Sequence, residues 1–100
     1  MPAKKKYITP EYLLIEAVKR SKLNKVKELV EVNKANINSV DKVGWTPLMW
    51  SCWLGNKKIV KFLITKKANV LIKDRYGITA IKLADKEYIK KLLEENKWRL

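Results

Sequence analysis

Apolar residues between positions 57 and 66 recur at the spacing of one helix face. The order i, i+1, i+4, i+5, which places four side chains on one stripe, is followed by Ile59, Val60, Leu63 and Ile64. The lysines of the same segment fall mainly off that stripe, where they would meet solvent. The pattern therefore predicts an amphipathic helix over about residues 57–66.

A shorter helix is predicted just before this one, because residues that start and stop helices stand at suitable places. Residues 41–44 form a turn that ends in a glycine, and Thr46 can then cap a helix with its hydroxyl. Pro47 fits the first helical position, where a missing N–H costs nothing. The helix should run over about residues 47–53 and end at Gly55–Asn56.

The chain also repeats itself. A shift of 33 residues superposes identical residues in the turn and at the helix start: Asp41 on Asp74, Gly44 on Gly77 and Thr46 on Thr79. A shift of 34 aligns an earlier segment, which indicates one extra residue between Glu31 and Lys34. A period of this length is typical of stacked units that cannot bury their apolar faces alone.

The segment from Asp41 to Asn56, with its Gly44 turn and its Thr46-Pro47-Leu48 opening, resembles the ankyrin repeat. The continuation from Ile59 to Val70 is similar to the second helix of that repeat. The resemblance covers about residues 12–95 and implies an all-α solenoid of three helix–loop–helix units with short hairpin-like tips. In that family a glycine usually follows the second helix, where Lys34 and Lys67 stand here, so these lysines should adopt a left-handed backbone.

The end repeats depart from the pattern and are interpreted as caps. Repeat one lacks the Thr-Pro-Leu opening at the aligned place and starts a helix at Thr9-Pro10 instead, while repeat three has Ala80 in place of proline and lacks four residues between its helices. We expect a single domain over residues 1–100. Its predicted parts are a basic tail (1–8), repeat one (about 9–40), repeat two (about 41–73) and a truncated repeat three (about 74–96). A segment cut from a longer array is the alternative.

The excess of positive charge can be interpreted in two ways. Of the 100 residues, 23 are Lys or Arg and 10 are Asp or Glu, which leaves a net charge of +13. An acidic partner would explain this excess. The abundance of Lys, Asn and Ile, whose codons are rich in A and T, would equally follow from compositional drift.

Missing residue types argue against most catalytic chemistry. The chain has no His and a single Cys, so it lacks the commonest general base and any set of thiolate ligands. Cys52 is expected to be a packed, inert thiol, and Asp41 and Asp74 to serve the repeat turns. We therefore expect no enzyme activity, no cofactor and no metal. No signal peptide and no apolar run of about 18 residues is seen, which favours a cytoplasmic protein.

Exposed aromatic and basic residues are the candidates for a binding surface. In ankyrin repeats partners touch the hairpin tips and the inner face of the first helices, which together form the concave face. The resemblance places these partner-binding candidates there: Lys42, Trp45, Trp53, Arg75, Tyr76, Ile78 and Lys86. Trp45 and Trp53 could instead pack on neighbouring repeats or on each other. Trp50 is expected in the core, and Trp98 is expected to fold back over the end of the stack.

The predicted function is non-catalytic binding of an acidic protein through the concave face and the hairpin tips. The alternative is an adaptor for nucleic acid or another phosphate surface, driven by the net charge. A third reading is a self-associating structural module. Salt dependence separates the first two, because phosphate binding weakens log-linearly with salt.

Overall fold

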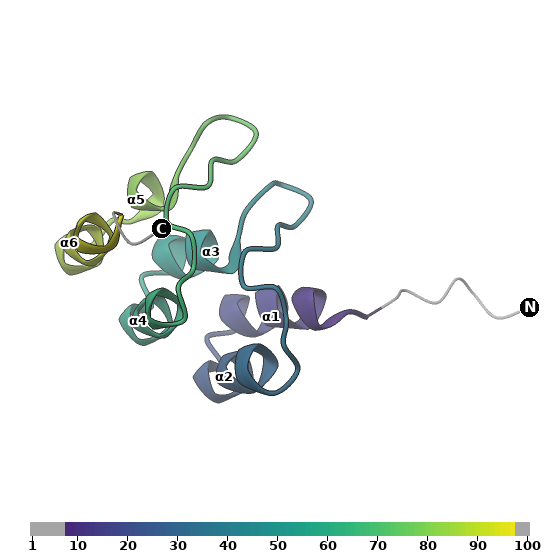
Figure 1. Cartoon of the computed structure of the whole chain (residues 1–100). Helices are drawn as coiled ribbons and strands as arrows, with labels where there is room; N and C mark the ends of the chain where they lie inside the picture. Colours follow the sequence, from purple (N-terminus) through teal and green to yellow (C-terminus); the bar gives the residue numbers. More distant parts are fainter. Residues whose placement is uncertain (1–7, 98–100) are drawn as a thin grey trace, which may run out of the picture.

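A computed structural model describes residues 8–97, which form six helices and, within that range, no strand. The helices are α1 (Pro10–Lys19), α2 (Leu23–Glu31), α3 (Pro47–Leu54), α4 (Lys57–Thr65), α5 (Ala80–Leu83) and α6 (Glu87–Asn96). Helices α1, α3 and α5 lie side by side in one row, and α2, α4 and α6 form a second row, drawn below the first in Figure 1. The predicted all-α stack of helix pairs is confirmed.

The helices begin where the sequence predicts. Thr9 accepts a hydrogen bond from the Tyr12 N–H at 3.0 Å, and Thr46 accepts one from the Met49 N–H at 3.1 Å. Each of these caps is followed by a proline in the first turn. Gly55 ends α3 in the left-handed conformation, and the next residue caps α4. The observed ends of α3 and α4 lie one residue from the predicted ones.

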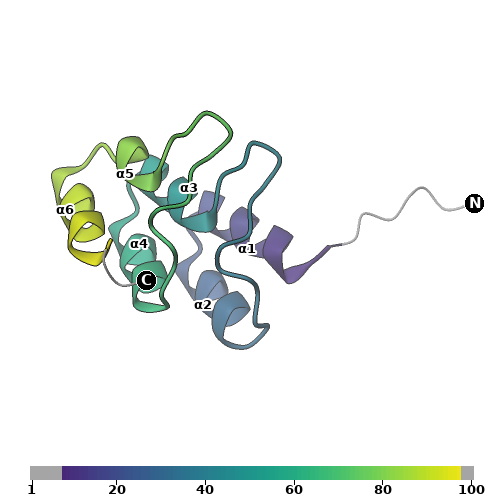
Figure 2. The same cartoon turned by 45° about the horizontal axis from the view of Figure 1, so that its top comes forward.

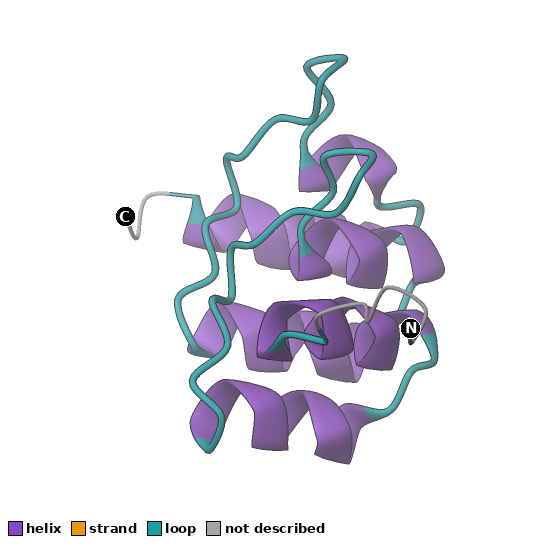
Figure 3. Ribbon diagram, turned by 90° about the vertical axis from the view of Figure 1, so that its right-hand side faces the viewer, coloured by secondary structure: helices purple, strands orange, loops and turns teal. Residues whose placement is uncertain are grey.

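Two loops protrude from the first row like fingers (Figures 2 and 3). In finger one (residues 41–45) the Asp41 N–H donates to the Trp45 carbonyl at 3.1 Å. In finger two (residues 74–78) the Asp74 N–H donates to the Ile78 carbonyl at 2.9 Å. Each tip contains a glycine with positive φ, as the turn requires.

The core runs between the two rows and through all three units. Its largest fully buried side chains include Leu14 from the first unit, Leu48, Ile59 and Leu63 from the second, and Ile89 from the third. Each unit thus covers the apolar face of its neighbour, as stacked repeats require.

Helix α5 is half as long as α3, with four residues against eight. The link from α5 to α6 (residues 84–86) is no shorter than the link that follows α3. The four residues missing from repeat three are therefore lost from its first helix. One helical turn of the inner row is absent at this end of the stack.

Within residues 8–97, three non-glycine residues adopt a left-handed backbone. Lys34 and Lys67 do so with φ values of 55° and 66°, which confirms the prediction. Ser21 does so too, with φ 57°, which was not predicted, although the shift of 34 residues places it on Gly55. Ser21 occupies the position after α1 that Gly55 occupies after α3, so both turns have the same shape.

The extra residue predicted in repeat one widens the turn after α2. There the Ala35 N–H reaches back six residues to the Leu29 carbonyl, at 3.0 Å. After α4 the Ala68 N–H reaches back five residues to the Leu63 carbonyl, also at 3.0 Å. The insertion is accommodated locally and leaves the stacking of the helices unchanged.

Candidate functional site

Asp41 organises finger one. One of its carboxylate oxygens accepts the backbone N–H groups of Val43 and Trp45, each at 3.0 Å. The other accepts the indole N–H of Trp50 at 2.7 Å. Both oxygens of this carboxylate thus accept hydrogen bonds from groups of the protein itself, which fits the role in the repeat turn that was predicted for Asp41.

Asp74 repeats the arrangement in finger two. It accepts the N–H groups of Tyr76 at 2.8 Å and Ile78 at 2.9 Å, and it accepts the indole N–H of Trp45 at 2.9 Å. The hydrogen bond from Ile78, followed by those from Tyr76 and Trp45 and by the charge of Arg75, lowers the pKa of the Asp74 carboxyl below its ordinary value. The ionised side chain therefore ties finger two to the base of finger one.

Three tryptophans line the inner face of repeat two. The ring centroids of Trp45 and Trp50 lie 4.7 Å apart, and those of Trp45 and Trp53 lie 5.9 Å apart, both edge to face. Trp45 and Trp50 are half-buried against the core, whereas Trp53 remains 58% exposed. The side-by-side packing considered for Trp45 and Trp53 is therefore present, and it leaves Trp53 open to solvent.

Other contacts join the two fingers at their tips. The Arg75 guanidinium donates to the carbonyl oxygen of Lys42 across the gap between the fingers. Tyr76 at the tip of finger two is 80% exposed, and Ile78 is half-buried. These contacts hold the tips of neighbouring repeats in a fixed relation.

Lys86 reaches the same surface from the third unit. Its side chain lies against Gly55, so that a Cβ placed on that glycine would be 3.0 Å from the Lys86 Cε. Since Gly55 directly follows α3, the Lys86 stem lies beside the helix end that carries Trp53. Each of the seven predicted site residues is thus connected to another one, either by a direct contact or through Asp74 or Gly55.

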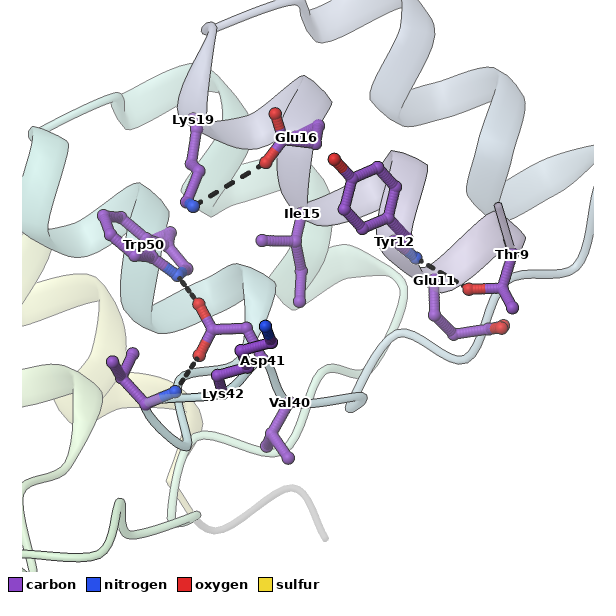
Figure 4. A pocket seen from close by; sticks show the side chains of 11 residues that line it. Thr9, Glu11, Tyr12, Ile15, Glu16, Lys19, Val40, Asp41, Lys42 and Trp50 are labelled. Carbon is purple, nitrogen blue, oxygen red and sulfur yellow. Dashed lines mark hydrogen bonds and ion pairs between the residues drawn. The ribbon is translucent and has the colours of Figure 1, made fainter. Parts of the chain in front are cut away.

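A groove between α1 and finger one was not predicted (Figure 4). It encloses about 780 Å³, and Tyr12, Ile15 and Lys19 of α1 form one side. Trp50 closes it, with the Lys19 ammonium 4.6 Å from the ring centroid. Aligning the repeats could not reveal this groove. Repeat one lacks the Thr-Pro-Leu opening, so its α1 residues could not be assigned positions by comparison with repeat two.

Among the described residues, the one thiol group is buried. Cys52 is completely buried, as expected of a packed thiol, and burial raises the pKa of its thiol to about 12. Between residues 8 and 97 no group of three His, Cys, Asp or Glu side chains could hold a metal ion. No helix of that part is long and apolar enough to cross a membrane. Trp98 and most of the basic tail lie outside the described residues.

Comparison with known proteins decides the family. A model of ankyrin repeats in three copies matches residues 14–98. The chain belongs to the ankyrin-repeat family. Ankyrin repeats generally mediate protein–protein interaction and are generally non-catalytic.

Curated relatives agree with this assignment. The chain is 41% identical over 58% of its length to osteoclast-stimulating factor 1 of Monopterus albus, spanning 27% of that protein. It is 42% identical over 71% of its length to ankyrin repeat and SAM domain-containing protein 6 of Rattus norvegicus, spanning 8% of it. It is 34% identical over 71% of its length to putative ankyrin repeat protein YahD of Escherichia coli K12, spanning 38% of it. The ankyrin-repeat chain thus spans well under half the length of each of these relatives.

Proposed function

We propose that this ankyrin-repeat chain binds an acidic protein through its concave face and finger tips. The proposed contact residues are Lys42, Trp45, Trp53, Arg75, Tyr76, Ile78 and Lys86. The observation that carries the proposal is the high exposure of Trp53 and Tyr76 on a scaffold that is otherwise tightly hydrogen-bonded. Large aromatic side chains left in water at fixed positions are typical anchors of protein interfaces.

Rigidity supports this reading. Trp45 is fixed by its bond to Asp74, and its ring in turn supports Trp53 at 5.9 Å. The Arg75 bond to finger one holds the tip that carries Tyr76. A surface that is already ordered before binding loses little conformational entropy when the partner arrives.

Charge supports an acidic partner. Lys42 and Lys86 are exposed, and within residues 8–97 neither has a carboxylate within ion-pairing distance. The two aspartates of the fingers are occupied by internal hydrogen bonds, as described above. Basic side chains around aromatic anchors attract an acidic surface and speed the encounter, while the anchors slow dissociation.

The test is a capture experiment from nuclease-treated lysate of the native cell. Wild type is compared with the double variant Trp53→Ala/Tyr76→Ala, which spares Trp45 because that residue holds finger two. Tyr88→Ala, which removes an exposed aromatic ring from α6, is the matched control. Far-UV circular dichroism verifies that all three proteins fold.

We expect a discrete protein to be retained by wild type and by the control, and to be lost with the double variant. Loss of two anchors worth about 2 kcal/mol each would weaken binding by roughly three orders of magnitude. Equal retention by the double variant would refute the concave face as the binding site.

A further inference from the structure

Positive charge is concentrated in the middle repeat. Residues 42–73 contain seven lysines and no Asp or Glu, whereas the acidic residues lie in the segments before and after. Five of these lysines stand in α4 or directly after it. Between Asp41 and Asp74 the chain thus carries 32 residues without a carboxylate, a gap that an even enrichment in lysine does not by itself predict.

Helix α4, which carries three of these lysines, belongs to the row of helices on the side of the stack away from the fingers (Figure 1). Helix α4 turns its apolar stripe to the core, so Lys58 and Lys61, one turn apart, are exposed on the opposite side. From the neighbouring α2, Lys27 reaches toward α4, with its ammonium 5.9 Å from the Phe62 ring centroid. Lys66 lies at the same distance from that ring.

A hollow of about 610 Å³ continues this surface at the edge where α2 and α4 begin. Its lining side chains are basic, amide, hydroxyl or apolar, and none is acidic: Ser21, Lys22, Leu23, Asn24, Lys25, Asn56 and Lys58. We call the exposed residues Lys22, Lys27, Lys58 and Lys61 the outer lysine face.

The acidic side chains nearest to this face are already paired. Glu28 binds Lys25 at 2.8 Å, and Glu31 binds Lys66 at 2.9 Å. Across residues 8–97, the four members of the outer lysine face have no carboxylate within 4 Å. Their charge is therefore compensated only by solvent and mobile ions.

We propose that the outer lysine face binds the phosphate backbone of a nucleic-acid duplex. Unpaired lysines on two neighbouring helices can each neutralise a phosphate, and binding then releases the counterions that the duplex holds. Phe62, the one aromatic residue of α2 and α4, is half-buried between two lysine ammonium groups. Helices α2 and α4 thus offer no open ring on which single-stranded bases could stack, and the exposed Tyr88 ring of the neighbouring α6 already holds the Lys57 ammonium 4.9 Å from its centroid.

The same lack of an open ring argues against a lipid surface, where exposed aromatic side chains anchor a protein at the interface. Binding should be independent of base sequence, because lysines that meet phosphates read no base edges. The surface is separate from the fingers, so this inference does not rest on the proposed protein binding.

The experiment measures the fluorescence anisotropy of a labelled DNA duplex of about 20 base pairs between about 50 and 200 mM salt. Four phosphate contacts predict a slope of log K against log salt of about −3.6. The test variant is Lys27→Gln/Lys58→Gln/Lys61→Gln. The control, Lys73→Gln/Lys82→Gln/Lys91→Gln, removes three exposed lysines elsewhere, so both variants have the same net charge.

We expect the test variant to lose at least tenfold in affinity and to reduce the slope to about −1, while the control stays close to wild type. The variant Trp53→Ala/Tyr76→Ala should bind the duplex as wild type does. Equal losses in the two lysine variants would overturn the proposal in favour of a pure net-charge effect. Tighter binding to single-stranded DNA, or to vesicles containing phosphatidylserine, would also overturn it.

Discussion

Replacing Lys67 with glycine should stabilise the protein. Lys67 follows α4 with φ 66°, and its N–H donates to the Ile64 carbonyl at 2.9 Å while the next N–H closes the turn onto Leu63. The same pair of bonds ends α3, where the residue is Gly55. The turn thus has the left-handed backbone after both helices, with a glycine after α3 and a lysine side chain after α4.

The magnitude follows from two opposing contributions. A left-handed non-glycine residue costs about 1–2 kcal/mol, which glycine avoids. Glycine also raises the conformational entropy of the unfolded chain, which reduces the gain in folding stability by about 0.4–1 kcal/mol. Lys67 is exposed and has no carboxylate within ion-pairing distance in the described part of the chain, so little else is lost. The net stabilisation is about 0.5–1 kcal/mol, or roughly 3–6 °C in Tm.

Urea unfolding followed by tryptophan fluorescence measures the effect, with an expected rise in the midpoint of about 0.5 M. Lys67→Ala keeps the strained backbone but removes the charge, so its midpoint should not change. Lys61→Gly places glycine inside α4 at an exposed position and should destabilise by about 1 kcal/mol. A midpoint for Lys67→Gly at or below that of wild type would refute the reasoning.

Two further outcomes are expected. Thr46→Ala should cost about 1–2 kcal/mol in urea unfolding, because Thr46 is buried and caps α3, whereas Thr79→Ala should cost only a few tenths, since Thr79 makes no side-chain cap bond. Equal costs would show that the cap bond is not the cause. Because the pKa of Asp74 is lowered in the folded state, its contribution to stability is present above the unfolded value of about 3.9 and is lost as the pH falls through the folded pKa. The variant Asp74→Asn should therefore be less stable than wild type at pH 7 and should lose less stability when the pH is lowered. Thermal unfolding between about pH 2 and 7 measures both effects. If stability fell with pH as steeply in the variant as in wild type, the prediction would be wrong.

Local features of the fold could be read from the sequence because their causes lie within a few residues. Thr46 and Pro47 start α3 through a bond to an N–H only three residues away. Gly55 ends that helix by its own backbone freedom. The stripe of α4 follows from helical periodicity alone, and the repeat period then implies that such units stack.

One local feature and one long-range feature escaped prediction. Ser21 takes the left-handed backbone without any residue type that favours it. The groove beside α1 was missed because repeat one departs from the pattern that the other repeats share. At Ser21 the turn overrides the preference of the residue, whereas the groove exists only because stacking brings residues 9–19 and 40–50 together.

The sequence by itself determined the family, the helices with their caps and breaks, and the excess of positive charge. Only the tertiary structure decided how the candidate surfaces are built. The Trp45 indole meets Asp74 from 29 residues away, and Arg75 reaches the carbonyl of Lys42 from 33 residues away. No local preference encodes such contacts, since they depend on the angle and distance at which one repeat stacks on the next. Stacking likewise divides the surface into an aromatic inner face and a lysine-rich outer one.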